Sequence, residues 1–329
     1  MTSTTSPAAP AVVAGLDLGG TKVLAAAVAP AAPLDVRAEV RRDTPRGAAA
    51  LVDALAAAVA ALDERLAADG HDGVAAVGVG VAGLVDRAGV LRFAPNLPGV
   101  VDLDVRTELA ARVGRPVTVD NDANCAALAE HRLGASAGSR SSVLLTLGTG
   151  IGGGLVIDGA VQRGAFGFAG EPGHMLVDPH GPPCPCGRRG CWERFASGSG
   201  LGRLARDAAA AGRASHIVEL AGGDPEAVRG EHVTAAALAG DPDAAGILVE
   251  LAWWVAVGVA NLVDLLDPEI VVVGGGLVAA GELLLGPVRE AYAGLVLAHD
   301  HRPSVPVVAA RLGERAGALG AALLAAAEV

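Results

Sequence analysis

The 329-residue sequence is poor in aromatic side chains, which make up only 2% of it, although apolar residues make up 52%. The core must therefore be filled by small aliphatic side chains, and the length favours two domains over one compact core. The sequence also lacks a surplus of positive charge, since its formal net charge is −11. That balance argues against nucleic acid as a partner. A few backbone amides still suffice to hold a phosphate group.

The first residues, Met1–Pro10, lack a basic start followed by an apolar stretch, so we expect no secretory signal. The most apolar window is Leu248–Leu266, and it carries Glu250, Asn261 and Asp264. Those side chains are costly inside a bilayer, so we expect a buried helix there. We therefore expect a soluble, cytoplasmic protein with no membrane partner.

Strands and helices alternate along the chain, which is the pattern of an α/β protein. Residues 1–11 form a Ser/Thr/Pro/Ala tail that we expect to be disordered. A strand, a Gly-rich turn and a second strand begin at residue 12, and the same arrangement recurs about 130 residues later. The sequence thus contains a coarse internal repeat with one Gly-rich hairpin in each half.

The first Gly-rich turn reads Asp17-Leu18-Gly19-Gly20-Thr21-Lys22. Glycines let the backbone adopt a positive φ and let its N–H groups approach a phosphate closely. Thr21 adds a hydroxyl donor, and Asp17 can face a metal ion bound to that phosphate. A plain β-hairpin turn is the alternative. The segment is neither a Walker A loop nor a GxGxxG dinucleotide-binding turn.

The second Gly-rich turn occupies 148–154, between the apolar strand 142–147 and a strand at 155–157. Two such turns can hold the phosphates of one nucleotide, whereas a mobile loop would explain only one of them. A third glycine turn at 274–276 follows a buried strand and can approach the nucleoside. The residues that we expect to bind the nucleotide in these two turns are Thr149, Gly150, Gly152, Gly153 and Gly275.

Short polar side chains are dense in Asp120-Asn121-Asp122-Ala123-Asn124, between a short strand and a helix. A helix N-cap needs only one such residue, and here there are four. A carboxylate at this place can accept a proton from an alcohol. Asn96, in Pro95-Asn96-Leu97-Pro98, is either a turn residue or a contact for the substrate.

The most specific motif is a histidine followed by three cysteines with the spacing H-x9-C-x-C-x4-C. Three thiolates and one imidazole fit a closed, tetrahedral, structural zinc site, and a disulfide plus a free thiol is the alternative. The expected ligands are His174, Cys184, Cys186 and Cys191. Two carboxylates, Glu171 and Glu193, flank this metal loop and would be held in place by it.

Taken together, these motifs resemble the ROK family of bacterial sugar kinases, open reading frames and repressors. The resemblance runs from about residue 12 to 325. It rests on Asp17–Lys22, Asn121–Asn124, Leu147–Gly154, Glu171–His174, Cys184–Glu193 and Val273–Gly276. The segment Gly190–Gly198 resembles especially the zinc-containing bacterial glucokinases of that family.

The resemblance implies an α/β fold of the two-domain actin-like ATPase and sugar kinase type, with an interdomain cleft. A small domain would hold residues 12–122 and 314–329, and a large domain with the zinc loop would hold 123–313. The family's repressors carry an N-terminal DNA-binding domain, which about eleven residues before the first strand do not provide. A homodimer or homotetramer is a further expectation from the resemblance.

The resemblance also implies the roles of the site residues. Asp122 would be the catalytic base, ionised at neutral pH from its ordinary pKa of about 3.9. ATP would bind the glycine turns, with Asp17 near Mg²⁺, and His174 would serve both zinc and sugar. The implied contacts with sugar hydroxyls come from Asn121, Asp122, Glu171, His174 and Glu193.

We therefore expect ATP-dependent phosphorylation of glucose at its 6-hydroxyl. Kinases for N-acetylmannosamine, N-acetylglucosamine, fructose or allose are the nearest alternatives, and polyphosphate could replace ATP as donor. A protein that senses sugar without turning it over is an alternative from a different functional class. A dinucleotide-dependent oxidoreductase using Gly274–Gly276 would need a GxGxxG turn that opens a helix, which the sequence does not supply.

Overall fold

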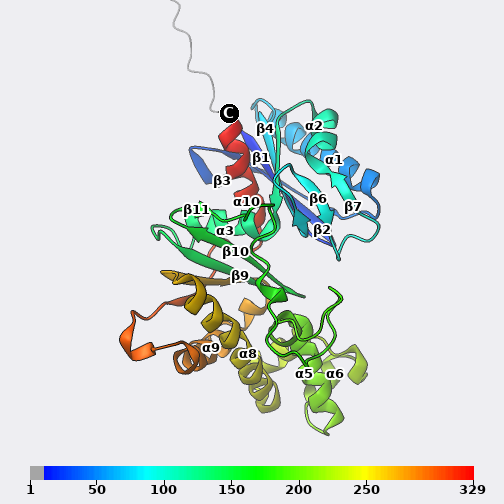
Figure 1. Cartoon of the computed structure of the whole chain (residues 1–329). Coiled ribbons are helices and arrows are strands. Elements are labelled where there is room, and N and C mark those ends of the chain that lie inside the picture. Colours follow the sequence, from blue (N-terminus) through cyan, green and yellow to red (C-terminus); the bar gives the residue numbers. More distant parts are fainter. Residues whose placement is uncertain (1–10) are drawn as a thin grey trace, which may run out of the picture. The chain divides into compact units, whose positions relative to one another are not determined.

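The computed structural model describes residues 11–329, so the expected tail, apart from Ala11, lies outside the described residues. The chain divides into two compact units, each an α/β assembly of its own (Figure 1). Unit 1 holds 11–129, Arg163–Phe168 and Arg315–Val329, and unit 2 holds Glu130–Gln162 and Ala169–Glu314. The α/β class expected from the alternation of strands and helices is confirmed.

Unit 1 is built on a five-stranded sheet with the strand order β3-β2-β1-β4-β8. β1 pairs antiparallel with β2 and parallel with β4, and β4 pairs parallel with β8. The carboxyl ends of β1, β4 and β8 therefore meet at one edge of the sheet. The strands are β1 (Val13–Leu18), β2 (Lys22–Ala29), β3 (Ala32–Asp43), β4 (Ala76–Val81) and β8 (Val117–Asn121).

Helices cover both faces of this sheet. α1 (Ala48–Ala68) and α2 (Val105–Val113) share one hydrophobic core with Leu16 and Leu18 of β1. α10 (Ala316–Ala325), in red in Figure 1, packs along β1 and β4 on the other face. The alternation of strand side chains produces these two faces.

The backbone of α10 lies directly against the backbone of β1 and β4, with no side chain between them at two glycines. A side chain at Gly15 would lie 1.8 Å from the Ala318 carbonyl oxygen, and one at Gly78 would lie 1.8 Å from that of Ala321. Glycine in the strands and alanine in the helix therefore replace the large aromatic residues that this sequence lacks. The expected core of small side chains is confirmed.

Unit 2 repeats the sheet of unit 1, with the strand order β11-β10-β9-β12-β13 and the same strand directions. The internal repeat that the sequence indicates is therefore a repeat of whole sheets. Its strands are β9 (Ser142–Leu147), β10 (Ile151–Ile157), β11 (Ala160–Val161), β12 (Ile270–Gly274) and β13 (Val307–Ala309).

Helices make up most of the rest of unit 2. α3 (Asp122–Leu133) begins in unit 1 and ends in unit 2, because the boundary between the units falls after Ala129. The others are α4 (Glu193–Ala196), α5 (Gly198–Ala210), α6 (Ser215–Leu220), α7 (Gly230–Leu238), α8 (Pro242–Leu266) and α9 (Glu282–Leu295). By length and composition α8 could cross a membrane, but 61% of its most apolar window is buried within the protein. α8 is thus the buried helix expected from the sequence.

One small sheet in unit 1 has no counterpart among the strands expected from the sequence. It is antiparallel, in the order β5-β6-β7. Its strands are β5 (Leu84–Val85), β6 (Val90–Phe93) and β7 (Val101–Asp104). Strands this short carry too few alternating residues to produce a recognisable pattern.

Candidate active site and metal centre

The turn between β1 and β2 holds the first Gly-rich motif. The Gly19 N–H donates to the Lys22 carbonyl at 3.0 Å and closes the turn. A side chain at Gly20 would lie 2.9 Å from Cβ of Asn96, so the Pro95-Asn96 turn packs directly against this one. Gly20, Thr21 and Lys22 are exposed, which suits residues that are to reach a phosphate.

Asp17 occupies the end of β1 and is partly buried. Burial, followed by the nearby charge of Asp122, raises the pKa of Asp17 to about 7. A side chain at Gly317, near the start of α10, would lie 2.5 Å from the Asp17 carboxylate. Glycine at this position therefore leaves room for a carboxylate that can bind a cation once it loses its proton.

The polar cluster Asp120–Asn124 spans the end of β8 and the start of α3, between a strand and a helix as the sequence predicts. Asn121 is the last residue of β8, and its Oδ1 accepts the Asn124 N–H at 3.0 Å. Its Nδ2 donates to the Gly83 carbonyl at 3.1 Å. Asn121 thus caps α3 and fixes the direction in which Asp122 leaves the sheet.

Asp122 is the first residue of α3, and its Oδ1 accepts the N–H of Ala123 at 2.9 Å. Burial raises the pKa of Asp122 above its ordinary value, and the hydrogen bond from Ala123 opposes that rise. The sequence alone suggested the ordinary value, so the burial of this carboxylate changes the expectation. A carboxylate with a raised pKa is a stronger base when ionised.

The turn between β9 and β10 is shorter than the run of glycines in the sequence. It comprises only 148–150 and is closed by a hydrogen bond of 3.0 Å from Gly148 N–H to the Gly150 carbonyl. The start of α5 supports it, since Gly198 N–H donates to the Gly148 carbonyl at 2.7 Å. The Ser199 hydroxyl donates to the Thr149 carbonyl, also at 2.7 Å.

Gly152 and Gly153 lie within β10 and not in the turn, where they pair with β9. A side chain at Gly153 would lie 2.4 Å from Cγ of Pro172, and one at Gly173 would lie 2.3 Å from the Ile151 carbonyl oxygen. These glycines therefore let the short 3-10 helix Pro172–His174 (η1) lie directly on β10. That contact places Glu171, which precedes η1, and His174, which ends it.

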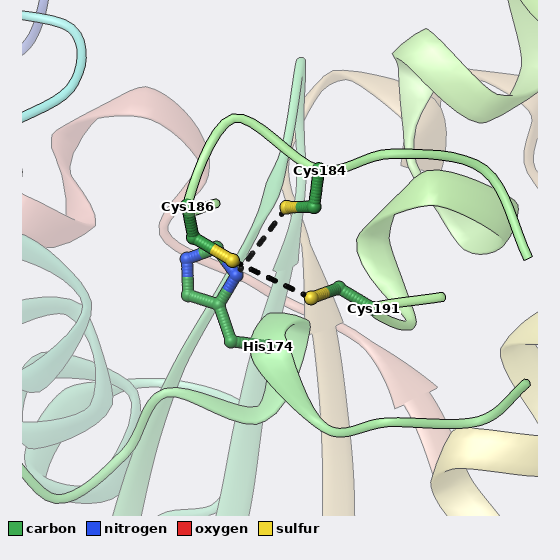
Figure 2. Close-up of side chains that lie close together, drawn as sticks. All are labelled: His174, Cys184, Cys186 and Cys191. Atoms are coloured by element: carbon green, nitrogen blue, oxygen red, sulfur yellow. Dashed lines mark hydrogen bonds between the residues drawn. The ribbon is translucent and has the colours of Figure 1, made fainter. Parts of the chain in front are cut away.

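His174, Cys184, Cys186 and Cys191 converge from η1 and the loop that follows it (Figure 2). Their ligand atoms all lie within 4.8 Å of one another. Sγ of Cys184 lies 3.9 Å from Nδ1 of His174, and Sγ of Cys186 lies 3.6 Å from Sγ of Cys191. All three cysteines of this group are free, so the alternative of a disulfide is not what the structure contains.

The donor set and its spacing fit zinc. A tetrahedron with Zn–S bonds of about 2.3 Å places its sulfur atoms about 3.8 Å apart. The four ligands come from the protein, which is the mark of a closed structural site. His174 turns Nδ1 to the cluster, so Nε2 is the ring atom that can meet a sugar hydroxyl.

Glu193 connects the metal cluster with the second glycine turn. Its Oε1 lies 3.2 Å from Sγ of Cys184 and 3.8 Å from Nδ1 of His174. Its Oε2 lies 2.7 Å from the position that a Cβ at Gly150 would take. A carboxylate, the Cys/His cluster and the second glycine turn are thus adjacent within unit 2.

Unit 2 also contains a pocket of about 940 Å³, large enough for a nucleoside. Gly148 and Thr149 line it from one side and Gly276 from another. Gly275 instead has a φ of +87°, and a side chain there would lie 2.5 Å from the Leu147 carbonyl oxygen. Glycine is therefore required at position 275, where the end of β12 comes close to the end of β9.

Several polar residues at these sites were not predicted from the sequence. Three arginines, Arg194, Arg206 and Arg229, line the pocket of unit 2 from three different elements. Arg163 donates from Nε to Oδ2 of Asp120 at 2.6 Å. Its partner lies 43 residues away in the sequence, so no local pattern could have indicated the pair.

The strand order of both sheets, the glycine turns and the carboxylate at the start of α3 define a sugar kinase of the actin-like ATPase class. The model of the ROK family matches residues 13–328, and the chain belongs to this family. The resemblance read from the motifs is therefore confirmed.

Individual relatives extend the comparison. A glucokinase of Streptomyces coelicolor is 41% identical over 314 residues, which cover 94% of this chain and 96% of that protein. An N-acetylmannosamine kinase of Salmonella typhimurium is 36% identical over 94% of this chain and 97% of its own length. A crystal structure of a ROK family glucokinase from Streptomyces griseus, in complex with glucose and AMPPNP, superimposes with a TM-score of 0.85. It is 41% identical, and the match covers 96% of this chain and 99% of that one.

Proposed function

We propose that this protein is a glucokinase, which transfers the γ-phosphoryl group of ATP to the 6-hydroxyl of glucose. The observation that carries the proposal is the likeness to the Streptomyces griseus glucokinase that binds glucose and AMPPNP. The Cys/His cluster supports it, because the motif that contains the cluster resembles the zinc-containing glucokinases of the family.

Asp122 is the catalytic base of this proposal. As the 6-hydroxyl oxygen attacks the γ-phosphorus, Asp122 accepts its proton, and the bond to the leaving ADP breaks. The raised pKa of Asp122 favours that transfer late in the reaction. Because the protein mainly positions the groups in such a transfer, the capping of α3 by Asn121 is part of catalysis.

The sugar contacts are assigned to Glu171, His174 and Glu193 of unit 2, with Asn121 and Asp122 of unit 1. The first three are held by η1 and the metal loop. Asn96 is assigned to the sugar as well, and its backbone and Cβ pack against the Gly20 turn.

The nucleotide is assigned to both glycine turns. Amide groups of Gly20 and Thr21, and of Thr149 and Gly150, would hold the phosphates, and the pocket of unit 2 would hold the nucleoside. Mg²⁺, when bound through Asp17, neutralises charge on the transferred phosphoryl group. Zinc in the Cys/His cluster contributes to folding and not to the reaction.

The 36% sequence identity to an N-acetylmannosamine kinase supports N-acetylmannosamine as an alternative substrate. We also propose that the protein acts in the cytoplasm as a homo-oligomer. Three exposed apolar side chains on α8, Val249, Trp253 and Leu265, support contact with a second copy.

The test is release of ADP from MgATP with glucose, mannose, fructose, N-acetylglucosamine and N-acetylmannosamine, and with no sugar. Preference for glucose supports the proposal. Preference for an acetamido sugar keeps the reaction and changes the substrate. Turnover with polyphosphate in place of ATP would change the donor, and binding of glucose without turnover would favour a sensor.

A further inference from the structure

Residues Arg163–Phe168 form a segment, here called the strap, that belongs to unit 1 although unit 2 holds the chain on both sides of it. Two contacts besides the one made by Arg163 attach it. Nε of Arg87 donates to the Gly164 carbonyl at 2.9 Å. Gly167 has a φ of +102°, and a side chain there would lie 2.6 Å from the Val85 carbonyl oxygen. The strap is therefore a built element of unit 1.

The ion pair of Arg163 reaches the turn that carries the proposed base. Its partner Asp120 is only 5% exposed. Oδ1 of Asp120 accepts the Asn121 N–H at 2.8 Å and an N–H of the Asn124 side chain at 3.0 Å. One buried carboxylate thus fixes the residues on both sides of Asp122, and Arg163 binds its other oxygen.

Arg163 brings a positive charge to a group of three carboxylates around this turn. Burial and the carboxylates of Asp120, Asp17 and Asp122 raise the pKa of the Cys125 thiol, and Arg163 opposes them. Cys125 on α3 therefore lies within electrostatic reach of all four groups. The carboxylates come from β8, β1 and the start of α3, and the cation comes from the strap.

We propose that Arg163 is a positioning residue for phosphoryl transfer: its guanidinium fixes Asp120, and through Asp120 the turn that carries Asp122. The proposal rests on the assigned role of Asp122 as base. Since Arg163 and Asp122 both act on the Cys125 thiol, the proposal extends to charge: the guanidinium would also favour the ionised form of Asp122, which is the form that can accept a proton.

The strap has a second consequence for the sugar residues. The chain leaves the strap after Phe168 and reaches Glu171 three residues later. The segment attached beside Asp122 is thus continuous with the segment that delivers Glu171 and His174. Arg163 thus pairs with a residue two positions before Asp122 and itself lies eight residues before Glu171 in the chain.

The experiment compares Arg163→Ala, Arg163→Lys and the double variant Asp120→Asn/Arg163→Ala with the wild type, each with verified zinc content and thermal unfolding. We expect Arg163→Ala to lower kcat on the order of a hundredfold, with glucose binding by calorimetry changed much less. The acid limb of its kcat/KM profile should rise by about one pH unit. Arg163→Lys should keep the acid limb of the wild type and lose part of kcat, because it retains the charge and lacks the Nε donor.

The double variant should return the acid limb to the wild-type position, because it removes the charge that Arg163 offsets. Arg140→Ala is the matched control: Arg140 pairs with Asp158 at the surface, and its loss should leave both kcat and the acid limb unchanged. An unchanged acid limb in Arg163→Ala, or the same shift in Arg163→Lys, would overturn the proposal. So would a loss of thermal stability alone.

One further measurement separates this proposal from the proposed function. Carbon NMR of labelled aspartate, with the Asp122 signal assigned from Asp122→Asn, reports the pKa of Asp122 without turnover. If wild type phosphorylates no sugar but Arg163→Ala raises that pKa, the proposed reaction fails and the action of Arg163 on Asp122 stands. If the pKa stays where it is in the wild type, the role of Arg163 fails by itself.

Discussion

Oε1 of Glu193 lies 3.2 Å from Sγ of Cys184, so a proposed sugar-binding carboxylate directly borders the metal cluster. Binding of glucose and binding of zinc should therefore depend on each other, with zinc in the structural role proposed for it. The first prediction tests that dependence.

We expect one zinc per chain, and we expect its removal to lower both the temperature of unfolding and the affinity for glucose. Loss of the metal frees the loop that orients His174 and Glu193, and a loss of affinity on the order of tenfold or more should follow. Elemental analysis, thermal unfolding and calorimetry before and after chelation measure these effects, and added zinc should reverse them. Protein that has demonstrably lost its metal and still binds glucose normally would contradict the link.

Asp122→Asn should remove most turnover and leave glucose binding largely intact. The amide keeps the shape of the side chain but cannot accept the proton, and such a loss costs about 10²–10⁴-fold. Steady-state kinetics and calorimetry on the same preparation measure the two effects. Asp158→Asn, which changes an exposed carboxylate, is the control. Near-normal turnover of Asp122→Asn would reject Asp122 as the base.

Asp17 should make the protein less stable as the pH rises. Its pKa is about 7 in the folded protein and about 3.9 in the unfolded chain, so between these values the folded state binds more protons. The free energy of unfolding should fall from about pH 4 to about pH 7, by roughly 4 kcal/mol from this group. Asp17→Asn should remove that fall, so the variant gains stability relative to wild type between pH 5 and pH 8. Urea unfolding of wild type and Asp17→Asn at pH 5 and pH 8 tests this. A difference in the free energy of unfolding between the two proteins that is the same at both pH values would refute the raised pKa of Asp17.

Two glycines of α8 should respond in opposite directions to alanine. A side chain at Gly258 would lie 2.0 Å from the Trp192 indole, whereas nothing lies within 4 Å of one at Gly246. Gly258→Ala should therefore destabilise the protein by about 1–3 kcal/mol or more. Gly246→Ala should stabilise it by up to about 1 kcal/mol, because alanine favours a helix. Denaturant unfolding compares the two variants, and equal effects would show that Trp192 does not limit the space at Gly258.

The features that could be predicted from the sequence are those whose parts lie close together in the chain. His174 and the three cysteines fall within a short segment, and their chemistry is specific enough to predict the cluster. The start of α3 was predicted because an unusual density of short polar residues precedes it. The limits of the second glycine turn were not, because glycine within β10 serves the packing of Pro172 and resembles a loop in the sequence.

Features that depend on the fold could not be predicted. Asp17 lies at the end of β1 and Asp122 at the start of α3, about a hundred residues later, and burial together with the nearby charge of Asp122 shifts the pKa of Asp17. The pair between Arg163 and Asp120 likewise joins segments 43 residues apart. Local patterns carry no information about such distances.

The packing of α10 bears on how the protein is made. β1 and β4 are synthesised early, yet the face that they present at Gly15 and Gly78 is covered by α10, which follows all of unit 2 in the chain. On the ribosome this face stays uncovered until residues 315–329 have emerged. The first unit to begin is therefore the last to finish folding, and a nascent chain released early would expose an apolar sheet to which chaperones can bind.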